Sequence, residues 1–526
     1  MNLSKRQDLR EASDNRFFRI GAAAVFSLTA LYVFFMIATR FTVNSDNMYF
    51  ILAAEDMLDG NWTLAGWRGG FFSALTGDIL WALPLRLVLG RKAALYLIGP
   101  ISCGLVAAFA FLTLRSERQT AIKPGWVCFA ALLPVALIPR ALWHSMATVG
   151  MHAVAIAQIF ALVWLASRLT DRPSEPSALS WVGFAVCVAL GCVADGFVLY
   201  FFAAPCLVVA AADAVSLRRR RALKLGAAAL GGVFLSKAFL IWLERSGGLT
   251  LTATKNGVIG VADLGRYLMN GADTWLRLFT RRPWLAVPEL TPVEWIGAGA
   301  MALFTAGMAA RCGVRLIRDW RGGATADKLL FFGGGAVVAS FTLTDVTQGE
   351  AAFRYLAPAY FLWMELAVRA TPRLSPGWRR NAALTALVLI GWSNLSAEFR
   401  ASPPGDNRLV ELADALKDRG AARIYGTYWE SAALNYYSGN RIQAAPIVYE
   451  NGTIGPAVAS RADWYRAGFN ARCLLVDETQ RDGLTNARIE AFFGPADEFL
   501  LYNQAEIRCY DVNLSEIMER NGIDEF

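Results

Sequence analysis

The sequence predicts an α-helical protein that crosses a membrane many times and ends in a small α/β domain outside it. Three observations support this: 55% of the 526 residues are hydrophobic and only 18% are charged, long apolar windows recur along most of the chain, and the composition changes near residue 399. Soluble proteins, even those with large cores, rarely combine these values. We therefore expect residues 1–398 in the membrane and residues 399–526 outside it.

The apolar windows have the length that crosses a bilayer, which is roughly 17 to 25 residues for about 30 Å of hydrocarbon. Lys and Arg collect before the first window and in "SLRRRRALK", and this excess places both segments in the cytoplasm. The windows lie near residues 18–38, 71–90, 94–113, 124–142, 150–167, 178–194, 196–215, 225–243, 294–312, 329–344, 355–369 and 382–398.

One of the seven windows between these two cytoplasmic segments must fail to span, because two points on one side are separated by an even number of crossings. The best exception is 71–90, "FFSALTGDILWALPLRLVLG", since it contains Asp78, Pro84 and Arg86. An ionisable group at the bilayer centre costs at least a few kcal/mol. We expect this segment to be juxtamembrane or re-entrant on the outer side, which leaves about eleven spans, a cytoplasmic N-terminus and an outer C-terminus.

The last part of the chain differs from the rest in charge and pattern. Residues 399–526 hold 13 Lys and Arg against 19 Asp and Glu, a net charge of −6, so the membrane part carries +14. The basic excess therefore suits cytoplasmic loops beside anionic lipid, and nucleic-acid binding has no support. We expect helices at "RLVELADALKDRG" and "YWESAALNYYSG", and strands at "ARIYG", "ARCLLVDE", "DEFLLYN" and "EIRCYDVN".

Two of the eight cysteines, Cys473 and Cys509, lie in this outer part, and both are in strand-like stretches. They either form a disulfide, as an oxidising compartment allows, or remain two buried thiols. The other six lie in or beside apolar windows, where cysteine behaves as a small hydrophobe.

The loop after the first window is unusually acidic. Its sequence, "TRFTVNSDNMYFILAAEDMLDGNW", opens an outer loop over residues 39–92. Asp46 precedes a short interfacial helix and either caps its N-terminus or has a chemical role. For that helix we expect an apolar face toward lipid, tryptophans in the aromatic belt and a solvated acidic face. The apolar face consists of Met48, Ile51, Leu52 and Leu58, and the tryptophans are Trp62 and Trp67. The acidic face consists of Glu55, Asp56 and Asp59.

Three segments resemble one enzyme family: this loop with its "EDML", the "RYLAP" that begins at Arg354, and "ADALKDRGAARIYGTYWESAALNYYSGNRI". They are similar to membrane-embedded glycosyltransferases of the GT-C superfamily, and most to the bacterial protein-mannosyltransferase-like and aminoarabinose-transferase-like enzymes. The chain departs from the family's pattern in having Asp46-Asn47 where Asp-Glu is common, and "GGFFSALTGDILW" in place of a "PP" element. The subfamily, the acceptor and any metal requirement therefore stay open.

The resemblance implies a GT-C fold and transfer of a sugar from a polyprenyl-phosphate carrier. The acceptor would be a glycan, lipid or protein on the outer face of a bacterial inner membrane, and transfer would proceed with inversion. It also implies that Asp46 is the base. The lipid phosphate that leaves needs cationic or hydrogen-bonding groups beside it.

Arg354 is the first candidate for phosphate binding, with Tyr355 beside it, because a guanidinium holds phosphate through two bonds. The alternative is an Arg that snorkels at a helix end. Arg140 and His144 lie in the outer turn "PRALWHSMATVGMHA" and are further phosphate candidates. His144 and His152, eight residues apart, bind a metal ion only if a third ligand completes the site, and no third ligand is evident. We therefore assign no cofactor, and a divalent metal remains an unsupported possibility.

Three further features carry alternatives. Lys237, inside a span, meets either Asp195 or the carrier phosphate. The loop 244–293 is either an interfacial helix or a lid over the lipid groove. Glu55 is a further candidate for substrate contact, and two residues are possible second acids, namely Asp345 and Glu350.

Other classes of membrane protein remain open. A lipid-linked-glycan transporter or flippase would also have many spans, but we see no obvious inverted repeat or paired broken helices. An O-antigen ligase or polymerase also uses polyprenyl-linked sugars, but its Arg- and His-rich loop typically lies late in the chain. A non-catalytic scaffold would explain the outer domain but not the gathering of an acid and bases.

Overall fold

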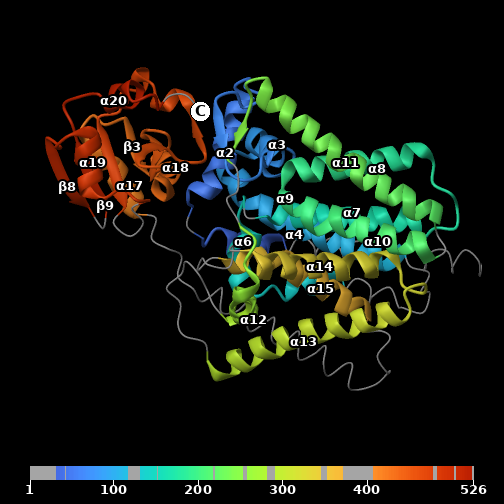
Figure 1. Ribbon diagram of the computed structural model, residues 1–526. Helices are drawn as coiled ribbons and strands as arrows, with labels where there is room; N and C mark the ends of the chain where they lie inside the picture. Colours follow the sequence, from blue (N-terminus) through green and yellow to red (C-terminus); the bar gives the residue numbers. More distant parts are fainter. Residues whose placement is uncertain are drawn as a thin grey trace, which may run out of the picture.

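The protein is mostly helical and carries its strands mainly in the last quarter of the chain (Figure 1). We refer to residues 407–523 as the C-terminal sheet region. The computed structural model describes residues 31–41, 43–116, 131–150, 152–216, 219–252, 257–280, 291–344, 352–370, 407–477, 482–502 and 505–523.

Within these described residues, six helical segments are long and apolar enough to cross a membrane. A further apolar helix, α8 (Ala178–Ala194), has 17 residues. The predicted window 382–398 lies outside the described residues, as do residues 18–30 and 124–130 of two other windows, so the count of about eleven spans is not confirmed. The six candidates lie in α4 (Arg91–Ser116), α7 (Ala153–Thr170), the run from α9 (Gly196–Val198) through η3 (Leu199–Ala203) to α10 (Ala204–Ser216), α11 (Arg219–Arg245), α13 (Pro292–Arg318) and α14 (Thr325–Leu343).

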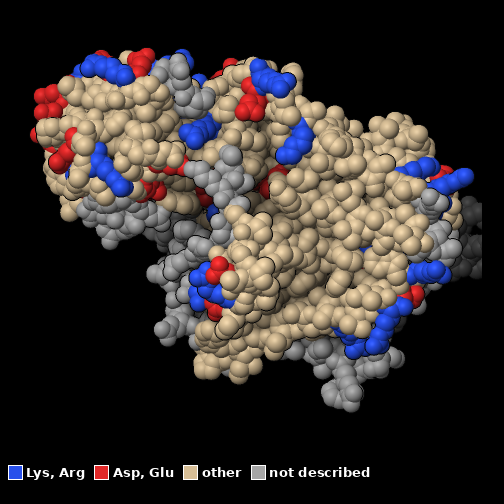
Figure 2. Space-filling view, viewed as in Figure 1, with Lys and Arg blue, Asp and Glu red and all other residues tan. Residues whose placement is uncertain are grey.

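The surface agrees with a multi-pass membrane protein. Figure 2 shows a broad area without charged side chains over the helices, between charged groups on the C-terminal sheet region and others at the far ends of the helices. Large apolar side chains are exposed on the helices, including Leu87, Val88 and Phe234. Such exposure is costly in water and favourable in lipid.

The segment that the sequence predicts to be the first outer loop folds into α2 (Ser45–Leu58), β1 (Trp67–Gly69), η1 (Leu75–Ile79) and α3 (Leu80–Leu89). The prediction that Met48 and Ile51 face lipid is wrong, because both side chains are fully buried. They are covered where α2 packs against α3, α4 and α18 (Tyr428–Tyr437). Trp67 is also buried, whereas Leu58 and Trp62 are exposed. Since α3 has only ten residues, no helix of spanning length covers 71–90.

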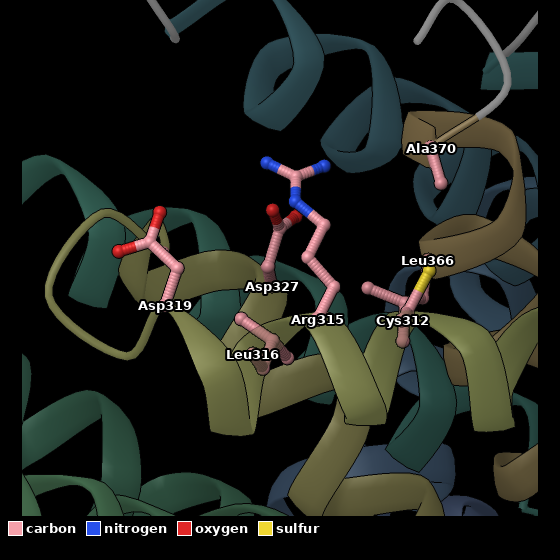
Figure 3. Close-up of a pocket in the computed structure, with 8 residues that line it drawn as sticks. Cys312, Arg315, Leu316, Asp319, Asp327, Leu366 and Ala370 are labelled. Carbon is pink, nitrogen blue, oxygen red and sulfur yellow. The ribbon is translucent and has the colours of Figure 1, made fainter. Parts of the chain in front are cut away.

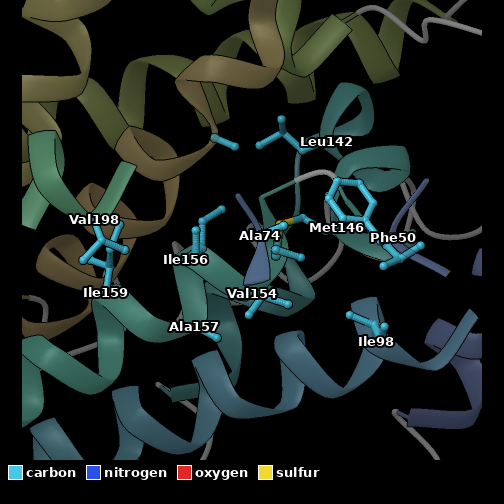
Figure 4. Packing of buried hydrophobic residues seen from close by; sticks show 14 of the residues in the cluster. Phe50, Ala74, Ile98, Leu142, Met146, Val154, Ile156, Ala157, Ile159 and Val198 are labelled. Atoms are coloured by element: carbon cyan, nitrogen blue, oxygen red, sulfur yellow. The ribbon is translucent and has the colours of Figure 1, made fainter. Parts of the chain in front are cut away.

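Small residues let the membrane helices approach closely. A Cβ atom on Gly232 of α11 would lie 2.5 Å from the carbonyl oxygen of Ala185 in α8, so only glycine is tolerated at this contact. Figure 4 shows how apolar side chains from several elements fill the core near the outer loop. They include Phe50 of α2, Ile98 of α4, Met146 of α6 (Trp143–Ala147) and Val154 of α7.

The later helices bring a second segment to the same end of the bundle. The predicted amphipathic helix in loop 244–293 is α12 (Leu264–Thr280), which packs against η2 (Arg140–Leu142), α13, α14 and η6 (Ala352–Leu356). The η6 turn leads directly into α15 (Ala357–Ala370), so it places Arg354 just before the helix. Whether α12 is a lid is not tested, and Asp345 and Glu350 lie outside the described residues.

The C-terminal sheet region contains a six-stranded sheet of order β5-β4-β3-β7-β9-β8. Strands β4, β3 and β7 are parallel neighbours, and the outer three pairings are antiparallel. The two helices and four strands predicted here are confirmed, as is the disulfide between Cys473 and Cys509, which face each other in β7 and β9. The elements are α17 (Asn407–Asp418), β3 (Arg423–Thr427), α18, β4 (Gln443–Glu450), β5 (Thr453–Pro456), β7 (Cys473–Asp477), α19 (Asn486–Phe493), β8 (Glu498–Tyr502), β9 (Ala505–Cys509) and α20 (Leu514–Arg520).

A small second sheet joins the two parts of the chain. Its order is β2-β1-β6, in which β1 of the first outer loop lies between β2 (Thr250–Leu251) and β6 (Ser460–Arg461). Backbone hydrogen bonds thus connect the C-terminal sheet region to the loop that carries Asp46. This region is docked on the outer loop rather than attached only through the chain.

Candidate active site

Asp46 lies in the first turn of α2, but it does not cap the helix. The capping residue is Asn44, whose side-chain oxygen accepts a hydrogen bond from the Asn47 backbone N–H at 3.1 Å. In return, the Asn47 side chain accepts one from the Asn44 N–H at 3.4 Å. This reciprocal pattern is a capping box, which satisfies N–H groups that a helix start leaves unpaired. The interpretation of Asp46 as the cap is therefore wrong.

Two side chains from distant parts of the chain hold the Asp46 carboxylate. The Tyr428 hydroxyl donates a hydrogen bond to Oδ1 at 2.5 Å, and Nη1 of Arg354 lies 3.6 Å from Oδ2. The side chains of Arg354 and Asp46 remain 24% and 21% exposed. Because 3.6 Å exceeds a hydrogen-bond distance, this pair is a loose electrostatic contact that an incoming anion can rearrange.

Arg354 is also tied to its neighbour in sequence. Its Nη2 donates to the Tyr355 hydroxyl at 3.3 Å, and its guanidinium carbon lies 5.2 Å from the centre of the Tyr355 ring. This geometry combines a hydrogen bond with a cation–π contact. The structure therefore brings together three of the residues predicted from the sequence: Asp46, Arg354 and Tyr355.

Sequence reasoning missed Tyr428, which reaches Asp46 from the start of α18 in the C-terminal sheet region. Burial, with the Asp46 charge as a second cause, raises the pKa of Tyr428 well above its usual value. The phenol therefore stays protonated and acts as a hydrogen-bond donor. The Ser45 hydroxyl fixes the same contact, because it bonds to the Tyr428 carbonyl and accepts the Ala432 N–H at 3.1 Å. The predicted helix at this place gave no sign of a partner 382 residues away.

The other acids of α2 have structural partners. Asp56 accepts hydrogen bonds from Nη1 of Arg461 at 2.6 Å and from the Trp67 indole at 2.8 Å. Both groups belong to the paired strands β6 and β1. The prediction of a solvated acidic face is thus wrong for Asp56 and for Glu55, whose side chain is 17% exposed and ion-paired, and correct for Asp59, which is exposed.

Glu55 lies about two and a half turns along α2 from Asp46, and it is not part of the same cluster. Its carboxylate pairs with Arg86, with Nε–Oε1 at 2.6 Å, and with Arg91, with Nε–Oε1 at 2.8 Å. Arg91 in turn donates to Asn440 at 2.8 Å. Glu55 therefore joins α2, α3, α4 and the C-terminal sheet region, and its role as a substrate contact remains a prediction.

The two histidines have different surroundings. Burial and the nearby Arg354 charge lower the pKa of His144 to about 4, so its imidazole is neutral at neutral pH. His144 can then contact a phosphate only as a hydrogen-bond donor, not as a cation. His152 instead bonds to Asp195. No group of three His, Cys, Asp or Glu side chains in the described ranges is arranged to hold a metal ion.

The remaining candidates are less defined. The backbone of Arg140 forms the start of η2, next to the short helix that carries His144. Lys237 is exposed on α11. The predicted pairing of Lys237 with Asp195 is wrong, because Asp195 binds His152 and no contact between the two is found among the described residues. Contact of Lys237 or Arg140 with a carrier phosphate remains a prediction.

A pocket lies at the other end of the bundle (Figure 3). Its polar lining includes Arg315 near the end of α13 and Asp327 near the start of α14, and its apolar lining includes Leu366 near the end of α15. Because Arg354 precedes the start of α15, the length of this helix separates the pocket from Asp46. It is not part of the candidate active site.

No protein-family model and no curated protein matches the chain. Among solved structures, ArnT from Cupriavidus metallidurans in the apo state aligns with a TM-score of 0.57 at 11% identity, covering 95% of this chain and 99% of ArnT. This chain has the ArnT fold. ArnT bound to undecaprenyl phosphate aligns with the same TM-score at 10% identity, covering 93% of this chain and 98% of that one.

ArnT is an aminoarabinose transferase of the GT-C type, so the fold that the sequence motifs implied is confirmed. The alignment includes the C-terminal sheet region as well as the membrane helices, because nearly the whole of both chains is covered. At 10% to 11% identity this likeness establishes the fold and not the activity.

Proposed function

We propose that this chain is a glycosyltransferase that moves a sugar from a polyprenyl-phosphate carrier to a glycan, lipid or protein, with inversion at the anomeric carbon. The proposal depends mainly on the contact between Asp46 and Arg354, because this reaction needs a proton acceptor and a phosphate-binding cation side by side. The ArnT fold, together with the undecaprenyl phosphate bound in one ArnT structure, supports a lipid carrier as the donor.

In this reaction the acceptor hydroxyl oxygen attacks the anomeric carbon and forms the new glycosidic bond. The bond between that carbon and the phosphate oxygen breaks, and its electron pair leaves with the lipid phosphate. The hydroxyl proton passes to Asp46, while Tyr428 keeps the carboxylate in place. Arg354 turns from Asp46 to the phosphate, so donor binding frees Oδ2 for the proton.

We place this chemistry on the outer face of a bacterial inner membrane, with a cytoplasmic N-terminus. Residues 1–398 are then the membrane-embedded catalytic part, and residues 399–526 an extracytoplasmic domain. The disulfide between Cys473 and Cys509 supports this orientation, because disulfides persist in oxidising compartments. The basic excess of the membrane part supports it too.

Sugar transfer by the purified protein in lipid nanodiscs tests the proposal. Radiolabelled polyprenyl-phosphate sugars are supplied with a cell-envelope extract, and labelled acceptor and released polyprenyl phosphate are measured. We expect both products in equal amounts. If proteoliposomes instead move the label across the bilayer while it stays on its carrier, the protein is a transporter. Transfer only from diphosphate-linked glycans would identify a ligase.

A further inference from the structure

A second buried polar pair lies close to Tyr355. Nδ1 of His152 is 2.5 Å from Oδ2 of Asp195, and both side chains are buried. The other oxygen of Asp195 accepts the Phe197 backbone N–H at 2.9 Å, which makes Asp195 the cap of α9. Both oxygens of Asp195 are thus held. In the neutral tautomer that donates from Nδ1 to Asp195, Nε2 of His152 presents a lone pair.

Nothing in the described part of the chain bonds to this Nε2 atom. Aromatic rings surround the imidazole instead: Phe197 stacks on it with ring centres 4.1 Å apart, Phe72 lies at 5.1 Å and Tyr355 at 6.0 Å. Aromatic walls with a single oriented acceptor suit a ligand that has an apolar face and a hydroxyl group, as a sugar ring has.

The backbone holds His152 in this place. Its φ is +69°, in the left-handed region that residues other than glycine rarely adopt. The preceding Gly150 donates its N–H to Asp78 at 2.9 Å, and the Val149 carbonyl accepts a hydrogen bond from the Asn47 side chain at 2.7 Å. These contacts fix Val149 against the start of α2 and Gly150 against η1.

Asp46 is therefore close to this segment. A Cβ atom on Gly150 would lie only 2.9 Å from the Asp46 carbonyl oxygen. Tyr355 forms the link on the other side, because its hydroxyl accepts a hydrogen bond from Arg354 while its ring faces His152. Tyr355 is thus a neighbour of both the phosphate-binding candidate Arg354 and the His152 imidazole.

We propose that His152 is a sugar-binding residue that accepts a hydrogen bond from a hydroxyl of the transferred sugar, with Phe72, Phe197 and Tyr355 around the ring. The inference rests on the proposed function, because it takes the donor to be a lipid-linked sugar. Asp195 is a positioning residue: it keeps the proton on Nδ1 and so keeps Nε2 an acceptor. The subsite selects for a sugar that carries a hydroxyl at the position facing His152.

Binding measurements separate the sugar from its carrier. We would measure the Kd of the purified full-length protein for undecaprenyl phosphate and for undecaprenyl-phosphate glucose, mannose, galactose and arabinose, and choose the sugar that adds most affinity. In His152→Phe, which retains an aromatic side chain and lacks the acceptor, we expect that added affinity to fall about three- to tenfold. The Kd for undecaprenyl phosphate itself should stay within about twofold.

Asp195→Asn gives a second readout. An amide N–H beside Nδ1 favours the opposite tautomer, in which Nε2 carries the proton and can no longer accept. We therefore expect the same loss of sugar-dependent affinity with the histidine still present. The matched control is Asp213→Asn, which alters another buried acid, bonded to Lys328 at 2.7 Å, near the end of α10 and away from His152.

Three results would overturn the inference. Unchanged sugar-dependent affinity in His152→Phe, with sugar transfer intact, removes His152 from the subsite and leaves the proposed function standing. An equal loss for bare undecaprenyl phosphate assigns His152 a general structural role. If no sugar adds affinity and none is transferred by the unaltered protein, the proposed function fails along with the inference.

Discussion

The Tyr428 hydroxyl donates a hydrogen bond to Oδ1 of Asp46 at 2.5 Å, from a part of the chain 382 residues away. The C-terminal sheet region is therefore not a separate attachment, since it completes the surroundings of the proposed base. The paired strands β1 and β6 hold it in this position. Any movement of this region relative to α2 would change the orientation of the carboxylate.

Tyr428→Phe removes only the hydroxyl and should lower kcat about 10- to 100-fold, because a hydrogen bond to a charged group contributes about 1.5 to 3 kcal/mol. The KM for the lipid-linked donor should change less than about twofold. Steady-state transfer kinetics measure both. Tyr502→Phe is the control, since Tyr502 also donates to a carboxylate, Glu411 at 2.7 Å, but on the surface. Equal kcat values for the two variants would remove Tyr428 from the site.

Arg354→Lys keeps the positive charge and loses the planar fork that holds a phosphate through two bonds. We expect the KM for the donor to rise about tenfold and the acceptor KM to stay unchanged. Titrating each substrate separately makes this distinction. Arg221→Lys serves as the control, because Arg221 contacts backbone carbonyls, such as that of Thr170 at 3.1 Å, and the Glu175 carboxylate at 3.9 Å. An unchanged donor KM in Arg354→Lys contradicts the assignment.

His144 makes stability depend on pH in a defined direction. The folded protein lowers its pKa from 6.5 to about 4 through burial and the Arg354 charge. Between these values the unfolded chain binds more protons, so stability is lost as the pH falls from about 6.5 to about 4. Over this range the loss from His144 is at most about 3 kcal/mol.

His144→Gln should remove this component, since glutamine does not titrate. Denaturation of detergent-solubilised protein at pH 7 and at pH 4.5 measures it: the unaltered protein should lose more stability between the two than the variant does. A parallel loss in both proteins would show that His144 is not buried as a neutral group.

The disulfide should stabilise the C-terminal sheet region. Cys473 and Cys509 are 36 residues apart, and loop-closure entropy for that length corresponds to about 4 kcal/mol. Cys473→Ser with Cys509→Ser should therefore lower the Tm of the region by several degrees. Calorimetry measures this, and thiol labelling of protein taken directly from cells shows whether the bond exists there. Labelling of both cysteines without reductant would contradict the extracytoplasmic placement.

Local pattern was sufficient for much of the fold. The helix at "YWESAALNYYSG" and the strand at "ARCLLVDE" were predicted from periodicity and turn residues, and both form as α18 and β7. The apolar face of α2 was misassigned, because an apolar side is the same in sequence whether lipid or protein covers it. The packing of α3, α4 and α18 against α2 shows that Met48 and Ile51 face protein.

Some residues of the candidate site could be identified from the sequence and others could not. Asp46 and Arg354 were identifiable because each lies in a short recognisable motif next to a span, and the structure brings them within 3.6 Å. Tyr428 and the pair of His152 with Asp195 were not, since these contacts connect residues far apart in sequence. A charged group inside an apolar window favours an ion pair, here between Lys237 and Asp195. Lys237 instead lies exposed on α11.

The most direct test of the account is the rate of sugar transfer by Asp46→Asn. Asparagine has nearly the same shape and can still accept the Tyr428 hydrogen bond, but it cannot take the acceptor's proton. We predict that transfer falls by about 10²- to 10⁴-fold, while Asp59→Asn, an exposed acid at the other end of α2, keeps full activity. Transfer by Asp46→Asn at the rate of the unaltered protein would contradict the central claim that Asp46 is the base.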